Sequence, residues 1–220
     1  MKERPILFSA QMVRAILDGR KTQTRRVVKG IDETYRGVED GKAWQMDECG
    51  DCHDVPCPYG VPGDRLWVRE TWQYGPDVTA GMMAAGKMSR RHVVYAATVQ
   101  DGHHPPSWRP SIHMPRWASR ITLEVIGVRV ERLQEISEAD AKAEGIYSAC
   151  IHVPPPIHTE TRYVAPGVKM VNAADEVDYE APAHRTAKHA FECLWESING
   201  YGSWSVNPWV WVVEFKRIKP

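Results

Sequence analysis

The chain has 220 residues, of which 43% are hydrophobic and 25% charged, proportions typical of a soluble globular protein that can bury a core. Lysine plus arginine equals aspartate plus glutamate, at 28 each, which excludes nucleic-acid binding through bulk positive charge. Any such contact would need a local basic patch.

The first residues carry charge and lack the apolar segment of a signal peptide, and no apolar run is long enough to span a bilayer. Five cysteines at irregular spacing favour free thiols or a metal site in a reducing compartment. We therefore expect a cytoplasmic protein without a membrane partner.

The first predicted helix covers residues 9–18, with Ser9 as its N-cap. Phe8 and Val13 have the spacing of a hydrophobic staple, which fixes the angle at which the chain enters a helix. Gly19 fits the left-handed position that commonly ends a helix. The residues that follow therefore start from a defined helix end.

The segment after this helix has the pattern G-x-K-x-x-T-x-R, carried by Gly19, Lys21, Thr24 and Arg26. It places an ammonium, a hydroxyl and a guanidinium within a few residues. Such a set can bind an anion or the polar edge of a base, and it can give a hydroxyl nucleophile its own base. The alternative is a solvated basic turn.

Residues 30–60 show little periodicity and are predicted as an insertion or a long hairpin. Within them, Cys49, Cys52, His53 and Cys57 could supply a tetrahedral zinc site. The competing interpretation is a set of free thiols, because a second C-x-x-C is missing and the four residues are crowded into a short segment. The pattern indicates no other cofactor.

A strand is predicted over residues 65–72, after the turn at Gly63 and Asp64. Alternation places Leu66, Val68, Glu70 and Trp72 on one face. A carboxylate on an apolar face costs free energy unless it has partners, and the basic segment could provide one. In the alternative register, Trp67 points inward and Glu70 is solvated.

Residues 75–91 are predicted as a mobile loop and residues 93–99 as a strand. The proline-containing connection that follows carries arginine beside tryptophan, which suits a stacking platform for bases. Arginine packed over tryptophan for structural reasons is the alternative. The residues concerned are Trp108, Arg109, Arg116 and Trp117.

The second half of the chain predicts a strand over residues 120–130 with a bulge near Gly127, and then a helix from Ser137 to Gly145. Residues 147–183 show no clear element and are predicted as an insertion. A last helix, over residues 186–199, buries Ile198 among other apolar residues, and a closing strand follows it. Mixed strands with three helices and a bulged strand indicate an α+β fold built on a small β-barrel.

The G-x-K-x-x-T-x-R spacing resembles the signature of the ASCH domain family, a branch of the PUA-like superfamily associated with RNA. Residues 62–70, 114–120 and 207–211 resemble a longer subfamily common in phage and prophage genomes. The resemblance implies a PUA-like barrel, mixed or antiparallel, with peripheral helices. Residues 1–220 would form a single domain with insertions at about 30–60, 75–91 and 147–183.

The resemblance also implies two functions. Small ASCH amidohydrolases remove acetyl groups from 4-N-acetylcytidine, and by this likeness Lys21 is the general base, Thr24 the nucleophile and Glu70 the group that orients or relays protons. In the alternative, the domain binds RNA or a modified nucleotide without catalysis. The residues expected to contact RNA or a nucleoside are Gly19, Arg25, Arg26, Trp108, Arg109, Arg116 and Trp117. The position of Glu70 relative to Lys21 and Thr24 discriminates between the two functions.

Overall fold

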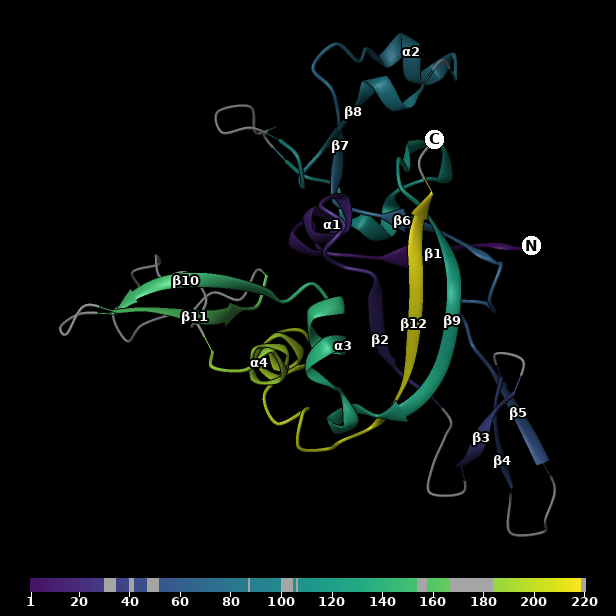
Figure 1. Ribbon diagram of the computed structural model, residues 1–220. Coiled ribbons are helices and arrows are strands. Elements are labelled where there is room, and N and C mark those ends of the chain that lie inside the picture. The colour runs from purple at the N-terminus through teal and green to yellow at the C-terminus, as the bar shows by residue number, and fades with distance from the viewer. Residues whose placement is uncertain are drawn as a thin grey trace.

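The structure is a computed structural model that describes residues 1–29, 35–39, 42–46, 52–86, 88–99, 105, 107–153, 158–166 and 184–218 (Figure 1). It is a mixed α+β fold, as predicted, centred on a five-stranded sheet. Among the described helices, none is long and apolar enough to cross a membrane.

The central sheet has the order β1-β6-β9-β12-β2, in which β1 is parallel to β6 and the other pairs are antiparallel. β1 and β2 form its two edges, so the sheet is not closed and the predicted barrel is not confirmed. The strands are β1 (Glu3–Leu7), β2 (Gln23–Val27), β6 (Arg65–Arg69), β9 (Thr122–Arg132) and β12 (Trp209–Ile218).

The predicted bulge in the long strand β9 is confirmed. Glu214 of β12 pairs with Gly127, and the next residue, Phe215, pairs with Val125. Ile126 is therefore the extra residue, and its side chain is half exposed. A bulge of this kind bends the strand and increases its twist.

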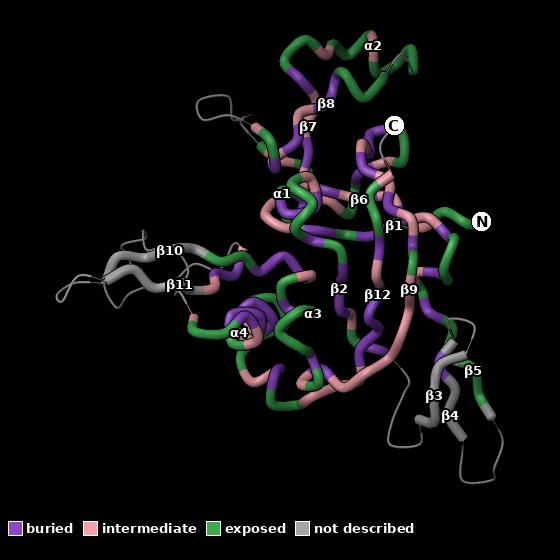
Figure 2. The backbone as a smooth tube through the Cα atoms, viewed as in Figure 1, coloured by how far each residue is buried: buried purple, intermediate pink, exposed green. Residues whose placement is uncertain are grey.

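The central sheet is most deeply buried along β2 and the first half of β12, where consecutive residues are buried (Figure 2). Trp211 and Val213 of β12 pack into a core that includes Phe8 and the inner face of α1 (Ala10–Leu17). Val210 and Val212, which alternate with them, pack into a second core with α4 (Ala187–Asn199) and α3 (Glu138–Ala143). β2 therefore lies between two packed layers.

The helix ends follow the sequence prediction closely. Ser9 accepts a hydrogen bond from Met12 N at 3.4 Å and begins α1, and Gly19 has a φ of +75° after the helix. Ser137 caps α3 in the same way, and Gly145 follows it with a φ of +102°. These two helix ends meet at the site described below.

Three smaller sheets surround the centre (Figure 1). Residues predicted as an insertion form an antiparallel sheet of β3, β4 and β5, and β7 pairs with β8. The third sheet is the β10–β11 hairpin. Their bounds are β3 (Tyr35–Glu39), β4 (Lys42–Met46), β5 (Cys52–Pro56), β7 (Trp72–Tyr74), β8 (Val93–Tyr95), β10 (Tyr147–Val153) and β11 (His158–Val164).

Several local predictions are wrong. The segment 75–91 contains α2 (Ala80–Ala84) and a 3-10 turn, η1 (Arg90–His92), and the strand predicted to reach residue 99 ends at Tyr95 in a turn. Residues 147–153 and 158–164 form the antiparallel strands β10 and β11, where no element was expected. That hairpin has no clear apolar alternation, because its stability comes from cross-strand pairing with a partner that a local pattern does not reveal. Further 3-10 turns are η2 (Ser111–His113), η3 (Arg116–Ala118) and η4 (Leu133–Glu135).

Helix α4 buries Ala190, Phe191, Leu194 and Trp195 as predicted, with Thr186 as its N-cap. Ile198 differs, because its side chain is 54% exposed. It lies in the last turn of α4, where it forms part of the rim of a pocket.

Candidate functional site

Lys21 is fully buried and bound to the end of α3. Its Nζ donates to Glu144 Oε2 at 2.6 Å and to the Glu144 backbone oxygen at 2.9 Å. The two residues also form an isolated β-bridge. Gly145 allows this approach, since a Cβ there would lie 3.4 Å from Lys21 Cβ and 3.2 Å from Ala15 Cβ. Two helix ends that are 123 residues apart are thus joined by one ion pair.

Burial lowers the pKa of the Lys21 ammonium below its ordinary value of 10.5, because the charged form loses its hydration. The negative charge and the hydrogen bond of Glu144 oppose this shift, and the charges of Arg26 and Arg25 add to it. A lysine with a lowered pKa is a better proton acceptor near neutral pH than one in solvent.

Lys21 and Glu144 belong to a larger charge network between the sheet and α3. Arg25, whose side chain is 0% exposed, lies 3.4 Å from both Glu144 and Asp140 and also binds Glu131. Arg129 binds Asp140 and Glu131, at 3.1 Å each. We call this set the charge network: Lys21, Arg25, Arg129, Glu131, Asp140, Glu144 and Glu214.

The charge network holds three cations and four carboxylates, so each buried charge has an opposite charge beside it. Burial alone would raise the pKa of the Asp140 carboxyl. Hydrogen bonds from Gln23 and Ser137, with the charges of Arg25 and Arg129, outweigh burial and lower it. The Asp140 carboxylate is therefore held in its charged form.

A pocket of about 60 Å³ lies between β2 and α4. At roughly 10–15 Å³ for each water-sized group, this volume holds about four to six such groups. Its polar lining includes Thr24, Arg25 and Glu144, and its apolar lining comes mainly from α4. The lining residues are Met12, Thr24, Arg25, Arg26, Val27, Glu144, Phe191, Leu194, Trp195, Ile198 and Asn199.

Three residues of this lining carry buried donors without partners. Arg25 Nε, Arg26 Nε and Trp195 Nε1 have no hydrogen-bond partner among the described residues. An unpaired buried donor costs about 1–3 kcal/mol, and a bound ligand that accepts a hydrogen bond would recover part of this cost. The pocket lining thus combines an apolar wall with a buried hydroxyl, that of Thr24, and with residues whose unpaired donors are themselves buried.

Glu70 is buried on the face that alternation predicts, together with Leu66, Val68 and Trp72, so the alternative register is wrong. Its partner, however, is Arg120, whose Nε and Nη2 donate to the two Glu70 carboxylate oxygens at 2.9 Å each. The predicted placement of Glu70 against Lys21 is therefore corrected: the carboxylate bound to Lys21 is Glu144. A bidentate guanidinium satisfies Glu70 without help from the basic segment.

The basic segment does not form one exposed surface. Arg25 is buried in the charge network and not on the surface, so its predicted contact is with a nucleoside in the pocket rather than with RNA on an exposed face. Arg26 Nη2 donates to the Leu7 backbone oxygen at 2.7 Å, and its guanidinium lies 5.5 Å from the centre of the Phe8 ring. Gly19 ends helix α1, because its positive φ turns the chain away from the helix.

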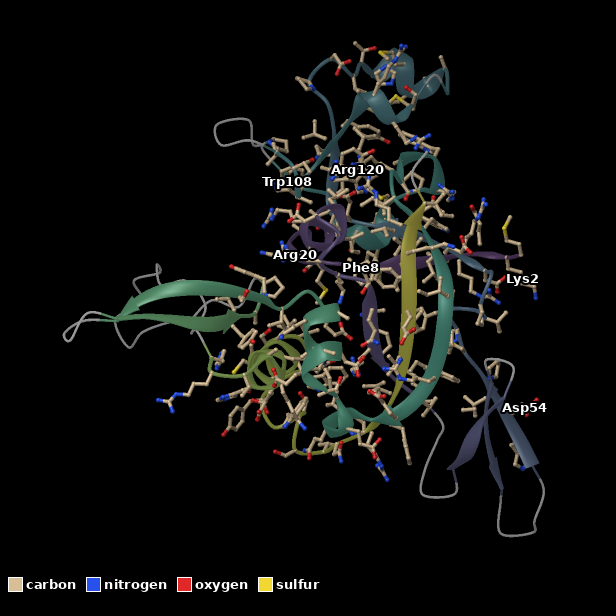
Figure 3. All side chains as sticks on the ribbon, in the orientation of Figure 1. Lys2, Phe8, Arg20, Asp54, Trp108 and Arg120 are labelled. Atoms are coloured by element: carbon tan, nitrogen blue, oxygen red, sulfur yellow. The ribbon has the colours of Figure 1, made fainter. Side chains whose placement is uncertain are left out.

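The arginine and tryptophan residues of the connection before β9 lie elsewhere, near β6 and β7. Arg109 lies over the Tyr74 ring at 4.7 Å, and Arg116 binds the exposed Glu3 carboxylate at 3.0 Å. Trp117 remains 38% exposed, and Figure 3 marks the position of Trp108. None of these arginine or tryptophan residues lines the β2–α4 pocket.

The predicted zinc ligands are only partly described. Cys49 lies outside the described residues, and only the backbone of Cys52 is described, so the zinc set stays a prediction. His53 is exposed. Cys57 is a buried free thiol, and burial raises its pKa to about 11.

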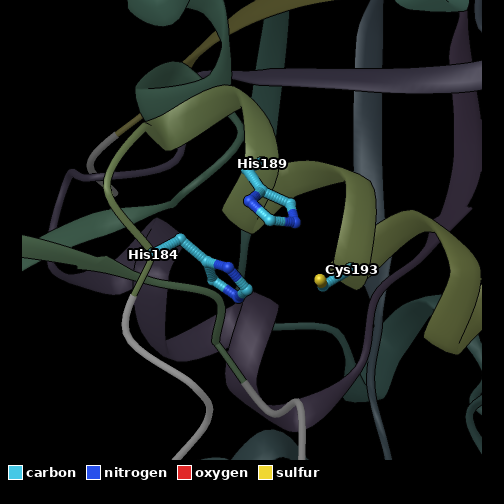
Figure 4. Close-up of side chains that lie close together, drawn as sticks. All are labelled: His184, His189 and Cys193. Carbon is cyan, nitrogen blue, oxygen red and sulfur yellow. The ribbon is translucent and has the colours of Figure 1, made fainter.

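Two features of the structure were not predicted from the sequence: Glu144 as the partner of Lys21, and a cluster of His184, His189 and Cys193 (Figure 4). The signal for Glu144 was its place next to Gly145 at the predicted end of a helix. The signal for the cluster was a histidine four residues before a cysteine on the last helix. In neither case does the sequence indicate the distant partner.

Comparison with known proteins gives no relative from which to assign a function. No protein-family model matches the chain, and no curated protein and no solved structure matches it significantly.

Proposed function

We propose that this protein is an amidohydrolase that removes an acyl group from a modified nucleoside of the 4-N-acetylcytidine type, in the β2–α4 pocket. The observation that carries the proposal is the buried Lys21–Glu144 pair, because Glu144 also lines the pocket beside Thr24. The resemblance to the ASCH family supports the same chemistry, together with a PUA-like fold in which the central sheet is the barrel-like core.

Thr24 is the nucleophile of the proposed reaction. Its Oγ attacks the acyl carbon, and the hydroxyl proton passes to neutral Lys21 through Glu144, which contacts both Lys21 and the pocket. The C–N bond then breaks, and the leaving amine takes up this proton. Water hydrolyses the acyl-Thr24 ester, which releases the carboxylic acid and restores the hydroxyl. Lys21 is charged in the free protein, as the partner of Glu144, and its lowered pKa makes the neutral amine that the first step needs easier to reach.

The pocket lining suits the acyl group and one edge of an acylated base. Phe191, Leu194 and Trp195 offer apolar surface for a planar ring. Arg25 Nε and Trp195 Nε1 are donors for the carbonyl and ring-nitrogen acceptors of a cytosine. Because the pocket holds only about four to six water-sized groups, fewer than the non-hydrogen atoms of an acetylated cytosine, the acyl group and one edge of the base enter it, and the rest of the nucleoside lies outside.

A panel of N-acylated nucleosides, followed by chromatography, tests the proposal. We expect deacylation by the wild type, and loss of about 10²–10⁴ in turnover for Thr24→Ala and for Glu144→Gln. Glu70→Gln is the matched control, since this carboxylate binds Arg120, and its turnover should stay near that of the wild type. Wild-type turnover by Thr24→Ala would exclude Thr24 as the nucleophile.

Two observations favour a second function, a reader that binds RNA or a modified nucleotide without hydrolysis. Glu70, whose contact with Lys21 would have favoured the enzyme, binds Arg120 instead. Glu144 already occupies two of the donor positions of Lys21, which is what a purely structural lysine would show.

A reader should bind acylated cytidine without turning it over. If single-stranded RNA binds through Arg109 and Arg116, its affinity should fall with salt. The slope of log binding constant against log salt concentration should become more negative by about 0.7 for each neutralised phosphate. Duplex RNA should bind less well.

A further inference from the structure

Three side chains that the proposed function does not use meet at the start of α4 (Figure 4). His184 precedes the helix, whereas His189 and Cys193 lie one turn apart on it. One potential ligand atom from each residue lies within 4.8 Å of the other two. The two imidazole rings are 4.6 Å apart between centroids.

The backbone holds each residue of this cluster in place. His184 exchanges two backbone hydrogen bonds of 2.8 Å with Tyr163 on β11, so it is fixed to the hairpin. His189 N donates to the Thr186 side chain, the N-cap of α4, at 3.2 Å. Positions four apart on a helix share a face, which places the Cys193 thiol beside the His189 ring.

The side chains have the chemistry of metal ligands. His184 Nε2 is buried and has no hydrogen-bond partner among the described residues. The neutral imidazole is a common metal ligand through either ring nitrogen. Two imidazoles and a thiol match zinc better than they match magnesium or calcium, which prefer oxygen ligands.

We propose that His184, His189 and Cys193 bind one zinc ion, which joins the β10–β11 hairpin to α4. Tetrahedral zinc with these ligands keeps the ligand atoms about 3.3–3.6 Å apart, so side-chain rotations that close about 1 Å complete the site. Cys193 binds as the thiolate: its S–H bond breaks, its proton goes to water and a Zn–S bond forms. Three protein ligands leave a fourth position for water or a small ligand.

The zinc ion would act on the pocket indirectly. Cys193 is followed on α4 by Leu194 and Trp195, which line the β2–α4 pocket. A metal bound at this turn holds the same part of the helix in one position, because the binding free energy becomes local folding free energy. Zinc binding by these three residues does not depend on whether the β2–α4 pocket is catalytic.

Metal titration of the full chain tests the site. Protein stripped with a chelator is titrated with Zn²⁺ against a chromophoric chelator, and separately with Co²⁺ as a spectroscopic probe. We expect one equivalent of Zn²⁺ at this site and, with Co²⁺, a thiolate-to-metal charge-transfer band with intense tetrahedral d–d bands. Cys193→Ser should abolish the charge-transfer band and weaken zinc binding at least about 100-fold, since even outer partners of a ligand contribute about 10–100-fold.

His189→Gln is the second variant, because this exposed residue can change without disturbing the core. It should weaken zinc binding and reduce the rise in melting temperature that Zn²⁺ gives to the wild type. The matched controls are His113→Gln, an exposed histidine on η2, and Cys57→Ser, the buried thiol near β5. Both should bind Co²⁺ at this site like the wild type.

Two results would overturn the proposal. One is no metal uptake by the wild type. The other is a charge-transfer band that survives in Cys193→Ser and disappears in Cys57→Ser, which would assign the metal to the segment of Cys49, Cys52, His53 and Cys57 instead.

Discussion

Replacing Glu144 by glutamine should strongly destabilise the protein, because Lys21 would lose its buried counter-charge. The Lys21 side chain is 0% exposed and that of Glu144 only 4%. Removing one partner of a buried ion pair costs about 3–5 kcal/mol, and the amide oxygen of glutamine keeps one acceptor, so we expect about 3 kcal/mol. This loss would be a large fraction of the stability of an ordinary domain.

An exposed ion pair of the same kind provides the control. Arg116 and Glu3 lie 3.0 Å apart, with their side chains 44% and 38% exposed. Exposed pairs contribute about 0–1 kcal/mol, so Glu3→Gln should change the free energy of unfolding by no more than this. Urea denaturation of both variants beside the wild type gives the two values.

The pH dependence separates electrostatics from packing. The pKa of Lys21 is lowered in the folded state, so the unfolded chain binds more protons between that lowered pKa and 10.5. In this window the Lys21 contribution to the free energy of unfolding rises with pH. In Glu144→Gln the pKa of Lys21 falls further, because the charge that opposed the shift is gone, and the window extends to lower pH.

We therefore expect the destabilisation by Glu144→Gln to be largest near neutral pH and to shrink towards about pH 10. The measurement is urea unfolding of the variant and the wild type at several pH values. A difference in unfolding free energy that stays constant from about pH 6 to about pH 10 would refute a buried, charged Lys21 and indicate a packing defect.

Three further predictions concern other residues. Gly145→Ala should cost about 1–3 kcal/mol more than Gly200→Ala in urea unfolding, because both have positive φ but only Gly145 is crowded by Lys21 and Ala15; equal losses would show that the crowding relaxes. Cys57 should be alkylated in the native protein at about pH 8 at least 100-fold more slowly than after unfolding, since burial raises its pKa to about 11; peptide mapping by mass spectrometry measures this, and equal rates would contradict it. Glu70→Gln should lose about 3 kcal/mol in thermal or urea unfolding, because it leaves the Arg120 guanidinium without its carboxylate, and a loss under 1 kcal/mol would mean that the pair is weakly coupled.

Local pattern in the sequence determined the elements that depend on neighbouring residues. The cap at Ser9 and the glycine at residue 19 define α1, and the alternation of Leu66, Val68 and Glu70 correctly predicts which face is buried. These features follow from backbone geometry, because side chains return to the same face about every 3.6 residues in a helix and every 2 residues in a strand. Consecutive residues are therefore enough to predict them. The weakly patterned β10–β11 hairpin was missed for the same reason.

Only the tertiary structure decided which charges meet. Glu70 and Glu144 are both buried carboxylates, and no local pattern indicates that the first binds Arg120 and the second Lys21, 123 residues away. No local pattern places His184 near Cys193 of α4 either; the backbone bridge of His184 to β11 holds it there. Buried charged residues pair, and metal ligands gather, because they lie close together in space. The packing of two layers on the central sheet brings them together, and their spacing along the chain does not.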